Sequence, residues 1–362
     1  MKRILFILHT PPPVHGASIV GGYIRQSAVI NTALSCRYIN LGTSRTVDEI
    51  GKNPLAKSGR YLMIMLRELW QLVVFRPHTV YLTISASGAG FYKDFPIAML
   101  AGLLGAKRLY HFHNKGISER QHKKLDNMLC RMLFYKAEVI LLSKYLYNDI
   151  AKYVPEESVR YCANGVGSEA VSSKQQAVSS KRIEILFLSN LIESKGVYVL
   201  LDACELLNKK GLDYSCIIVG GEGDITAGIL NREIQSRGLA ESVYYAGKQY
   251  GADKDALLIK ADIFTLPTFY SNECMPLVIL EAMQHALPVV STTEGAIPEI
   301  VSDGATGFLV PRKDAVALAD KLELLINDKQ LREAMGQEGR RKFETEYTLN
   351  AFELRLKAIL DE

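Results

Sequence analysis

Short apolar runs alternate with longer amphipathic stretches along the whole chain. In the first half, five runs have the length of strands, at residues 4–8, 80–85, 109–113, 139–143 and, more weakly, 159–166. Strands that alternate with helical segments in this way are typical of βαβ units. The pattern therefore predicts a parallel sheet covered by helices.

The second half repeats this plan. Its strand-like runs lie at 185–189, 216–221, 243–247, 262–267, 287–292 and 307–310. A helical pattern then extends from Ala315 to the C-terminus, with a break near Tyr347. Between the halves, residues 168–181 are polar and of low complexity, with Ala-Val-Ser-Ser-Lys present twice. We interpret this stretch as a linker between two α/β domains, at 1–168 and 182–346.

Length and composition are those of an ordinary globular enzyme. The chain has 362 residues, 48% hydrophobic and 23% charged, and this length suits two domains. Its six cysteines are scattered without a Cys-x-x-Cys pair, which indicates reduced thiols in a cytosol. The apolar start is too short for a signal peptide, and the stretches at 61–75 and 96–106 are too interrupted or too short to span a bilayer. We therefore expect a cytoplasmic protein.

Charge is divided unevenly between the halves. Residues 1–170 hold 22 lysines and arginines against 11 acidic residues, whereas the remainder holds 21 against 28. This asymmetry predicts an anionic partner for the first half: lipid headgroups, a phosphorylated acceptor or nucleic acid. Within it, the basic run from Arg120 to Lys124 leads into 125–135, where Leu, Met and Phe recur at helical spacing. Such a helix can lie on an anionic membrane; the alternative is a core-packed helix with a solvated basic edge.

The most informative local feature is a pair of glutamates, Glu273 and Glu281, separated by an apolar segment that contains Pro276. Proline favours the first turn of a helix, which would place Glu281 on the helix and Glu273 on the preceding loop. Two carboxylates so placed can face one cavity and bind different hydroxyls of one ligand. The alternative is a capped core helix with solvated glutamates.

The segment around this pair resembles the signature of family 4 glycosyltransferases. In that family a Glu-x7-Glu motif precedes a Pro-Val-Val strand and a Gly-Gly-x-Pro-Glu turn, and here Pro288-Val289-Val290 and Gly295-Ala296-Ile297-Pro298-Glu299 follow. The resemblance implies an α/β fold of the GT-B type, with two Rossmann-like, doubly wound parallel-sheet domains facing a central cleft. It also implies that 1–168 is the acceptor-side domain, joined by a last helix at about 347–362, and that 182–346 binds the nucleotide sugar.

The resemblance also assigns the donor site. Lys195 and Gly196 match an element whose lysine neutralises the donor diphosphate, but Asn190 stands where the family has arginine and Ser189 where it has glycine. Asn190 supplies hydrogen bonds without charge, so another cation could assist. The other donor-binding residues that we expect are Gly16 on the loop after the first strand, Gly221 in a glycine-rich turn, Lys248 at the nucleobase loop, Glu281 at the ribose, and Glu273 at the sugar.

The first half supplies the predicted active-site histidine. His113 ends the strand at 109–113 and aligns with a histidine near the reacting sugar; a structural histidine is the alternative. We interpret His15 as an ordinary loop residue. The Asp253-Lys254-Asp255 sequence matches the Asp-x-Asp metal motif of another glycosyltransferase fold, but it enters a helix away from any strand end, so we expect surface charge there. No metal site or other cofactor is expected.

Together these features predict a retaining, hexosyl-type glycosyltransferase with Glu273, His113 and Lys195 as its catalytic residues. The substrates expected are a nucleotide diphosphate sugar and a saccharide or lipid-linked acceptor of bacterial surface polysaccharide assembly, reached at the inner face of the cell membrane. Two alternatives are a nucleotide-sugar 2-epimerase on the same fold and a non-catalytic nucleic-acid-binding protein. A basic stripe interleaved with aromatic residues is missing, so nucleic acid is not an expected partner. Sequence alone identifies neither the sugar nor the base.

Overall fold

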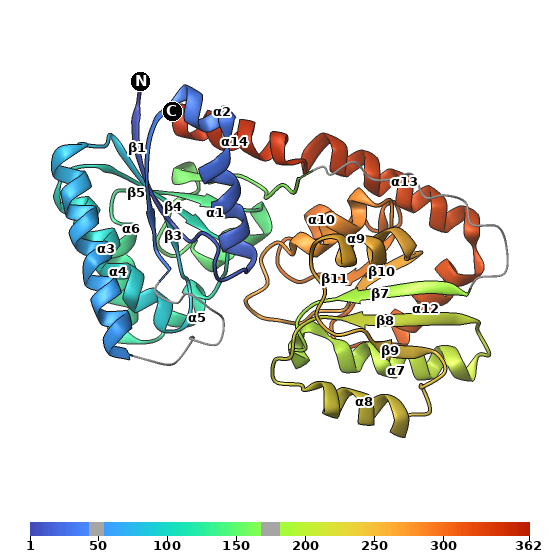
Figure 1. Cartoon of the computed structure of the whole chain (residues 1–362). Helices are drawn as coiled ribbons and strands as arrows, with labels where there is room; N and C mark the ends of the chain where they lie inside the picture. The colour runs from blue at the N-terminus through green and yellow to red at the C-terminus, as the bar shows by residue number, and fades with distance from the viewer. Residues whose placement is uncertain (43–53, 168–181) are drawn as a thin grey trace. The chain divides into compact units, whose positions relative to one another are not determined.

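The computed structural model describes residues 1–42, 54–167 and 182–362, which form two compact units (Figure 1). Unit 1 consists of Met1–Gly165 together with Leu349–Glu362, and unit 2 of Val166–Thr348. The predicted linker at 168–181 lies outside the described residues.

Unit 1 is built on a parallel sheet of six strands in the order β2-β1-β3-β4-β5-β6. The strands are β1(Arg3–Leu8), β2(Ser35–Asn40), β3(Thr79–Ile84), β4(Lys107–Phe112), β5(Ala137–Leu141) and β6(Val159–Tyr161). Every residue of β3 is buried, because helices cover both faces of a parallel sheet. This double coverage explains why the central strands are almost continuously apolar in the sequence.

The edge strand β2 was not predicted, and its position explains why. Its sequence, Ser-Cys-Arg-Tyr-Ile-Asn, is mostly polar, and only Ile39 in it is buried. A half-exposed edge strand gives no apolar run to detect. At the other edge the predicted strand at 159–166 is shorter than expected, because β6 ends at Tyr161.

Two layers of helices cover the sheet of unit 1. One layer contains α3(Pro54–Val74), α4(Gly88–Leu103), the short α5(Ile117–Arg120) and α6(Lys124–Phe134); α4 contacts both α3 and α6. The other contains α1(Gly16–Gln26), α2(Ala28–Ala33) and the C-terminal helix α14(Leu349–Asp361), which lies against α2 (Figure 1). An ion pair of 2.8 Å between Arg160 Nε and Glu362 Oε2 also ties the C-terminus to this unit.

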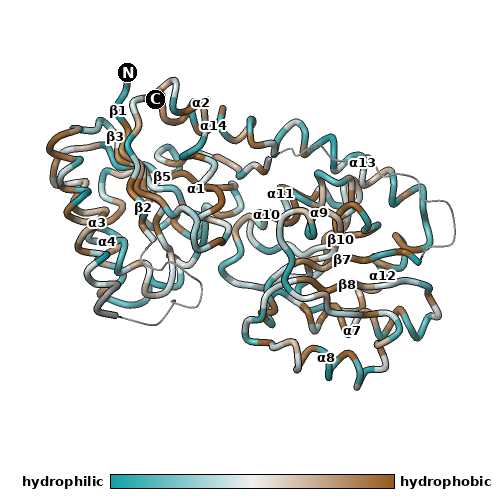
Figure 2. The backbone as a smooth tube through the Cα atoms, viewed as in Figure 1, coloured by the Kyte–Doolittle hydropathy of each residue, from teal (hydrophilic) through white to brown (hydrophobic). Residues whose placement is uncertain are grey.

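Unit 2 has a second parallel sheet of six strands, in the order β12-β11-β10-β7-β8-β9. The strands are β7(Ile183–Leu188), β8(Tyr214–Val219), β9(Val243–Tyr245), β10(Ile263–Leu266), β11(Val289–Thr292) and β12(Gly307–Val310). Its helices are α7(Val197–Lys209), α8(Ala227–Ser236), α9(Gly251–Lys260), α10(Leu277–Gln284), α11(Ile297–Ile300), α12(Ala315–Asn327) and α13(Lys329–Glu346). Figure 2 shows that the hydrophobic segments of the chain gather in the strands of the sheets.

The predicted C-terminal helical stretch has one break more than expected. The break near Tyr347 is present, but the helix also stops at Asp328. The side chain of Asp328 accepts a hydrogen bond of 2.9 Å from the Leu331 amide and so caps α13. An aspartate flanked by helix-forming residues supports either a cap or a helix interior, and only the packing of α12 and α13 decides between them.

The strands of each sheet are parallel, so their carboxyl ends lie along one edge. In unit 2 this edge carries the loops that follow β7, β8, β10 and β11, where four of the eight predicted site residues lie: Asn190, Lys195, Gly221 and Glu273. Among the residues that the structure describes, no helix combines the length and the apolarity that crossing a bilayer would require.

Candidate active site

A buried lysine–glutamate pair lies at the carboxyl edge of the unit 2 sheet. Lys195 ends the 3₁₀ helix η4(Glu193–Lys195) after β7, and Glu273 lies on the loop before α10. Lys195 Nζ is 2.5 Å from Glu273 Oε2, and only 16% and 8% of the two side chains are exposed. Thr268 Oγ1 donates to the same carboxylate oxygen at 3.3 Å, and the Tyr270 ring lies 4.7 Å from Nζ. Two predicted catalytic residues are therefore in direct contact.

Backbone contacts between three loops hold this pair in place. Gly196 has φ +92°, and its Cα approaches the Pro267 carbonyl so closely that a Cβ would collide with it. The Phe269 amide donates to the Ser194 carbonyl at 2.7 Å, which ties the loop after β10 to that after β7. Gly295, with φ +56°, packs against the Glu273 carbonyl in the same way. Glycine is required at both positions because only it tolerates positive φ and this close approach.

Glu281 lies on α10 itself. Pro276 is the N-cap of this helix rather than its first residue, and Glu281 follows in the second turn as predicted. Glu281 Oε1 accepts a salt bridge of 2.8 Å from Lys254 Nζ on α9. The other oxygen, Oε2, is buried and has no hydrogen-bond partner among the described residues. A buried carboxylate oxygen without a donor is costly unless a ligand or water supplies one.

Three further predicted residues meet next to β7 and β8. The Gly221 amide donates to Asn190 Oδ1 at 3.3 Å, and the Leu191 amide donates to the Gly221 carbonyl at 2.8 Å. The stem of Lys248 passes over Gly221, because a Cβ built on this glycine would lie 3.5 Å from Lys248 Cδ. Lys248 therefore brings a side chain, and not only its backbone, to the position where Asn190 lacks the charge of an arginine.

Two ion pairs at this edge were not foreseen. Lys254, the central residue of the Asp253-Lys254-Asp255 sequence, is the partner of Glu281 and not an isolated surface charge. Glu294, which follows β11, is only 3% exposed and pairs with Arg312 at 2.8 Å. The partners are 27 and 18 residues apart in the chain, so no local spacing rule could have detected them.

In unit 1 two histidines lie at the carboxyl end of β4. His111 is the second-last residue of the strand, and His113 directly follows the strand. His111 is fully buried and shares a hydrogen bond of 2.5 Å with the Tyr81 hydroxyl. The His113 ring lies 4.2 Å from that of His111, so the two side chains share one side of the strand as predicted. Both ring nitrogens of His113 are buried without a hydrogen-bond partner in the described part of the chain. Burial, with His15 nearby, lowers the pKa of His113 to about 4, so its imidazole is neutral at physiological pH.

The loop after β1 brings two more histidines close to His113. Burial, with Lys93 and both His15 and His113 nearby, lowers the pKa of His9 to about 3. His15 is the N-cap of α1: its Nδ1 accepts from the Ser18 amide at 3.3 Å. Gly16 begins that helix, and no described atom lies within 4 Å of the place where a Cβ would be. His15 therefore has a structural role, and His9 is a neighbour of His113 that no sequence pattern predicts.

The basic segment at 120–124 requires one correction. Arg120 is not part of a solvated basic face, because it is only 8% exposed. Its guanidinium pairs with Asp126 at 3.1 Å, donates to the Gly88 carbonyl at 2.6 Å and stacks on Phe91. Lys123 and Lys124 are exposed, which both the membrane-bound helix and the solvated basic edge require. Arg120 is therefore a structural residue between α4 and α6.

The fold as a whole is that of the GT-B glycosyltransferases. HepE from Anabaena, solved in complex with UDP, superposes with a TM-score of 0.79 over 100% of both chains, although only 17% of the aligned residues are identical. The two parallel six-stranded sheets with flanking helices correspond to two Rossmann-like domains, as predicted. At this level of identity the likeness concerns the fold alone.

Comparisons of the sequence with known proteins indicate which group of glycosyltransferases the chain resembles. Residues 169–342 match the family described as glycosyl transferases group 1. The amylovoran biosynthesis glycosyltransferase AmsK of Erwinia amylovora is 29% identical over 265 residues, which are 72% of this chain and 65% of that protein. The phosphatidyl-myo-inositol mannosyltransferase of Mycobacterium leprae is 34% identical over 50% of this chain and 48% of its own length. These matches support a place among the group 1 glycosyltransferases, although they span less than two thirds of those relatives' length.

No cluster of at least three His, Cys, Asp or Glu side chains suited to a metal ion is found in the described ranges. Asp253 lies in the first turn of α9, where an acidic residue is favoured by the helix dipole. All six cysteines are free thiols, and Cys36 alone is not fully buried.

Proposed function

We propose that this protein is a retaining glycosyltransferase of family 4 that transfers a hexosyl group from a nucleotide diphosphate sugar in bacterial surface polysaccharide assembly. The observation that supports this most is the carboxyl edge of unit 2. There the Lys195–Glu273 pair and the buried Glu281 oxygen, which has no hydrogen-bond partner among the described residues, follow strands of one parallel sheet. The match of residues 169–342 to the group 1 family covers the same unit.

Each of these groups has a proposed part in donor binding. The donor diphosphate would take Lys195 from Glu273, because two phosphates offer more negative charge than one carboxylate. Glu273 would then accept a hydrogen bond from a sugar hydroxyl, and Glu281 Oε2 would accept from a ribose hydroxyl. Asn190 and the Gly221 turn would donate to the phosphates, with Lys248 as the additional cation.

The proposed chemistry is a displacement on one face of the sugar. The bond from the anomeric carbon to the diphosphate oxygen breaks, the acceptor oxygen bonds to that carbon from the same face, and the acceptor proton passes to the departing phosphate. No side chain acts as a covalent nucleophile. Lys195 stabilises the negative charge that develops on the leaving diphosphate, which is where electrostatic catalysis has its largest effect.

Unit 1 is the proposed acceptor domain. The His113 imidazole is neutral and both its nitrogens are without a partner in the described residues, so it can donate to or accept from a hydroxyl of either substrate. Gly16 would let a phosphate approach the start of α1. A lipid-linked acceptor is favoured by the basic charge of this half and by the lipid named in the mycobacterial relative.

Thermal-shift assays with UDP, GDP, ADP and their sugar derivatives test donor binding first, because a ligand raises the unfolding temperature by mass action. Stabilisation by one nucleotide sugar, followed by transfer with retained anomeric configuration in NMR, would support the proposal. Release of free nucleotide with an epimerised sugar, in the absence of acceptor, would instead indicate a 2-epimerase. Filter binding with single- and double-stranded nucleic acid tests the non-catalytic alternative.

A further inference from the structure

The outer face of α3 exposes an unusual amount of apolar surface. Seven large apolar side chains of this helix are between 41% and 63% exposed: Leu62, Met63, Leu66, Leu69, Trp70, Val73 and Val74. Spacings of three, four and seven residues put them on one continuous side of the helix. Figure 2 shows the hydrophobic colouring along α3. A single exposed leucine needs no explanation, but a contiguous strip of this size indicates a binding surface.

Charged residues of α3 are arranged around this strip in a consistent way. Glu68 is the only acidic residue of the helix, and it is buried on the opposite side. Arg67 is exposed beside the strip, and Arg76 is exposed just beyond the end of the helix. Among the residues that the structure describes, the exposed side of α3 therefore presents apolar and cationic groups with no acidic side chain between them.

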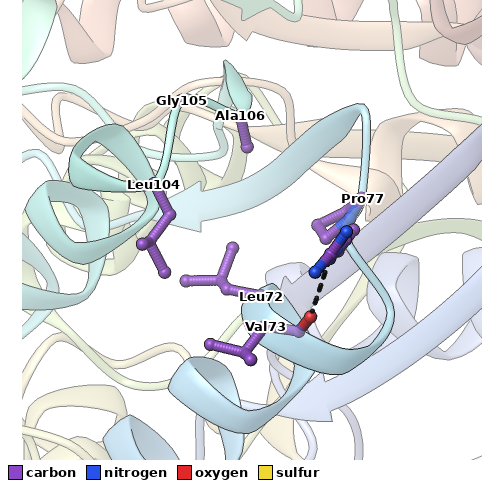
Figure 3. A pocket seen from close by; sticks show the side chains of 7 residues that line it. Leu72, Val73, Pro77, Leu104, Gly105 and Ala106 are labelled. Atoms are coloured by element: carbon purple, nitrogen blue, oxygen red, sulfur yellow. Dashed lines mark hydrogen bonds between the residues drawn. The ribbon is translucent and has the colours of Figure 1, made fainter.

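A pocket continues the strip at the end of the helix. It has a volume of about 350 Å³ and lies between the end of α3 and the turn that follows α4. Figure 3 shows Leu72 and Val73 from one side and Leu104 and Ala106 from the other pointing toward the same space, which Gly105 also lines. Arg76 lines the pocket and donates a hydrogen bond of 3.3 Å to the Val73 carbonyl. The pocket thus combines an apolar wall with a cation.

The helix α6, in the same layer, has a similar outer side. Its Leu125, Met128 and Met132 are between 47% and 58% exposed, and the exposed residues beside them include Lys124 and Arg131. Asp126, the acidic residue of this helix, is buried in its pair with Arg120. The layer formed by α3, α4 and α6 therefore exposes two helices of the same chemical character.

We propose that the α3 strip, defined as Leu62, Met63, Leu66, Leu69, Trp70, Val73 and Val74, inserts into the surface of an anionic lipid bilayer. An interfacial helix buries its apolar side among acyl chains while arginine and lysine at its border contact anionic headgroups. A second copy of the chain is a poorer occupant, because a symmetric contact would bring the arginines of both copies together. This proposal rests on the lipid-linked acceptor proposed above, because it names the surface that would bring the protein to the membrane. Binding of the strip to lipid can nevertheless be measured without any transfer reaction.

Trp70 is the only tryptophan of the chain, and with 63% of its surface exposed it reports directly on this strip. Its emission should shift to shorter wavelength when the whole protein is mixed with phosphatidylglycerol–phosphatidylcholine vesicles at low salt. Lipids brominated along the acyl chains should quench it. Pure phosphatidylcholine vesicles, or high salt, should weaken both effects, because the headgroup attraction is electrostatic.

Substitutions that keep Trp70 identify the surface. Leu66→Ser should weaken vesicle binding roughly five- to tenfold, as expected for a side chain that moves from half-exposed to buried in lipid. Arg67→Gln should weaken it about fivefold at low salt and less at high salt. Leu354→Ser is the matched control, because Leu354 on α14 is 51% exposed, compared with 52% for Leu66, and belongs to the other helical layer of the unit. It should bind as the unsubstituted protein does.

Three results would overturn the proposal: an unchanged Trp70 spectrum with anionic vesicles, equal binding of Leu66→Ser and Leu354→Ser, or a shift that requires no vesicles and accompanies dimer formation. The last would assign the strip to a second copy of the chain. Thermal shifts with UDP and UDP-sugars on the same variants separate this proposal from the proposed donor site. A variant that loses lipid binding but keeps nucleotide binding would show that the substitution affects the α3 strip and leaves the proposed donor site intact.

Discussion

Replacement of Lys195 by alanine is the most direct test of the candidate site. The ammonium is held by Glu273 at 2.5 Å and the Tyr270 ring at 4.7 Å, and it is mostly buried. If it stabilises the departing diphosphate, its loss should cost about 2–4 kcal/mol of transition-state stabilisation, or about 30- to 900-fold in kcat. The assay is initial-rate transfer from the nucleotide sugar that gives the largest thermal shift.

The same substitution also affects stability, and the two effects can be separated. Without Lys195, the buried Glu273 carboxylate keeps one hydrogen bond from the described residues, that of 3.3 Å from Thr268, and stranding a buried charge costs about 3 kcal/mol. The double variant Lys195→Ala, Glu273→Gln removes the stranded charge. It should recover most of the lost stability in urea unfolding and remain inactive, because the cation is still missing.

A second lysine–glutamate pair provides the matched control. Lys260 pairs with the buried Glu184 at 2.6 Å, at the amino end of β7, whereas Lys195 follows the carboxyl end of the same strand. Lys260→Ala should lower stability by leaving Glu184 without its partner, yet leave kcat unchanged. Near-normal turnover by a folded Lys195→Ala protein, or an equal loss of turnover in Lys260→Ala, would refute the assigned role.

Four further outcomes are expected. Glu281→Gln should raise the donor KM with a smaller effect on kcat, measured in steady-state kinetics; an unchanged KM would remove Glu281 from the ribose site. Burial raises the pKa of Glu68 to about 9, so between pH 4.5 and about 9 only the unfolded chain loses this proton, and the native state loses about 1.4 kcal/mol of stability per pH unit. Glu68→Gln should therefore raise the unfolding temperature more at pH 8 than at pH 5. The lowered pKa values of His9 and His113 make stability fall with decreasing pH, because below pH 6.5 only the unfolded chain gains these protons. Each histidine should remove about 1.4 kcal/mol of stability per pH unit down to about pH 4. Urea midpoints that stay level in this range would contradict the burial of both rings. Transfer activity should survive excess EDTA, and strict restoration by Mg²⁺ or Mn²⁺ would contradict metal independence.

The fold class was predictable because parallel sheets covered on both faces leave a strong signal. The strands β3 and β10 are buried throughout, so their sequences are apolar without alternation and are bounded by polar turns. The same reasoning could not find β2, whose exposed edge lets polar residues replace apolar ones. It also could not find the Asp328 cap, because aspartate is tolerated in either setting.

The candidate site was predictable only as a set of residues. The sequence places Glu273 on a loop and Glu281 on the second turn of a helix, because proline and the apolar pattern between them fix that local geometry. Their partners, Lys195 and Lys254, lie 78 and 27 residues away, and these distances in the chain are closed only when strands of one sheet come side by side.

What the sequence by itself determined is therefore local: which segments become strands and helices, and which residue types gather at strand ends. The tertiary structure alone decided which charges meet, because pairing depends on the strand order and on loop contacts such as that of Gly295 with the Glu273 carbonyl. It also decided that His113 is neutral and that Arg120 is internal, since desolvation depends on what packs around a group. For α3, the apolar residues were visible in the sequence, but only the fold turned one side of that helix away from the core.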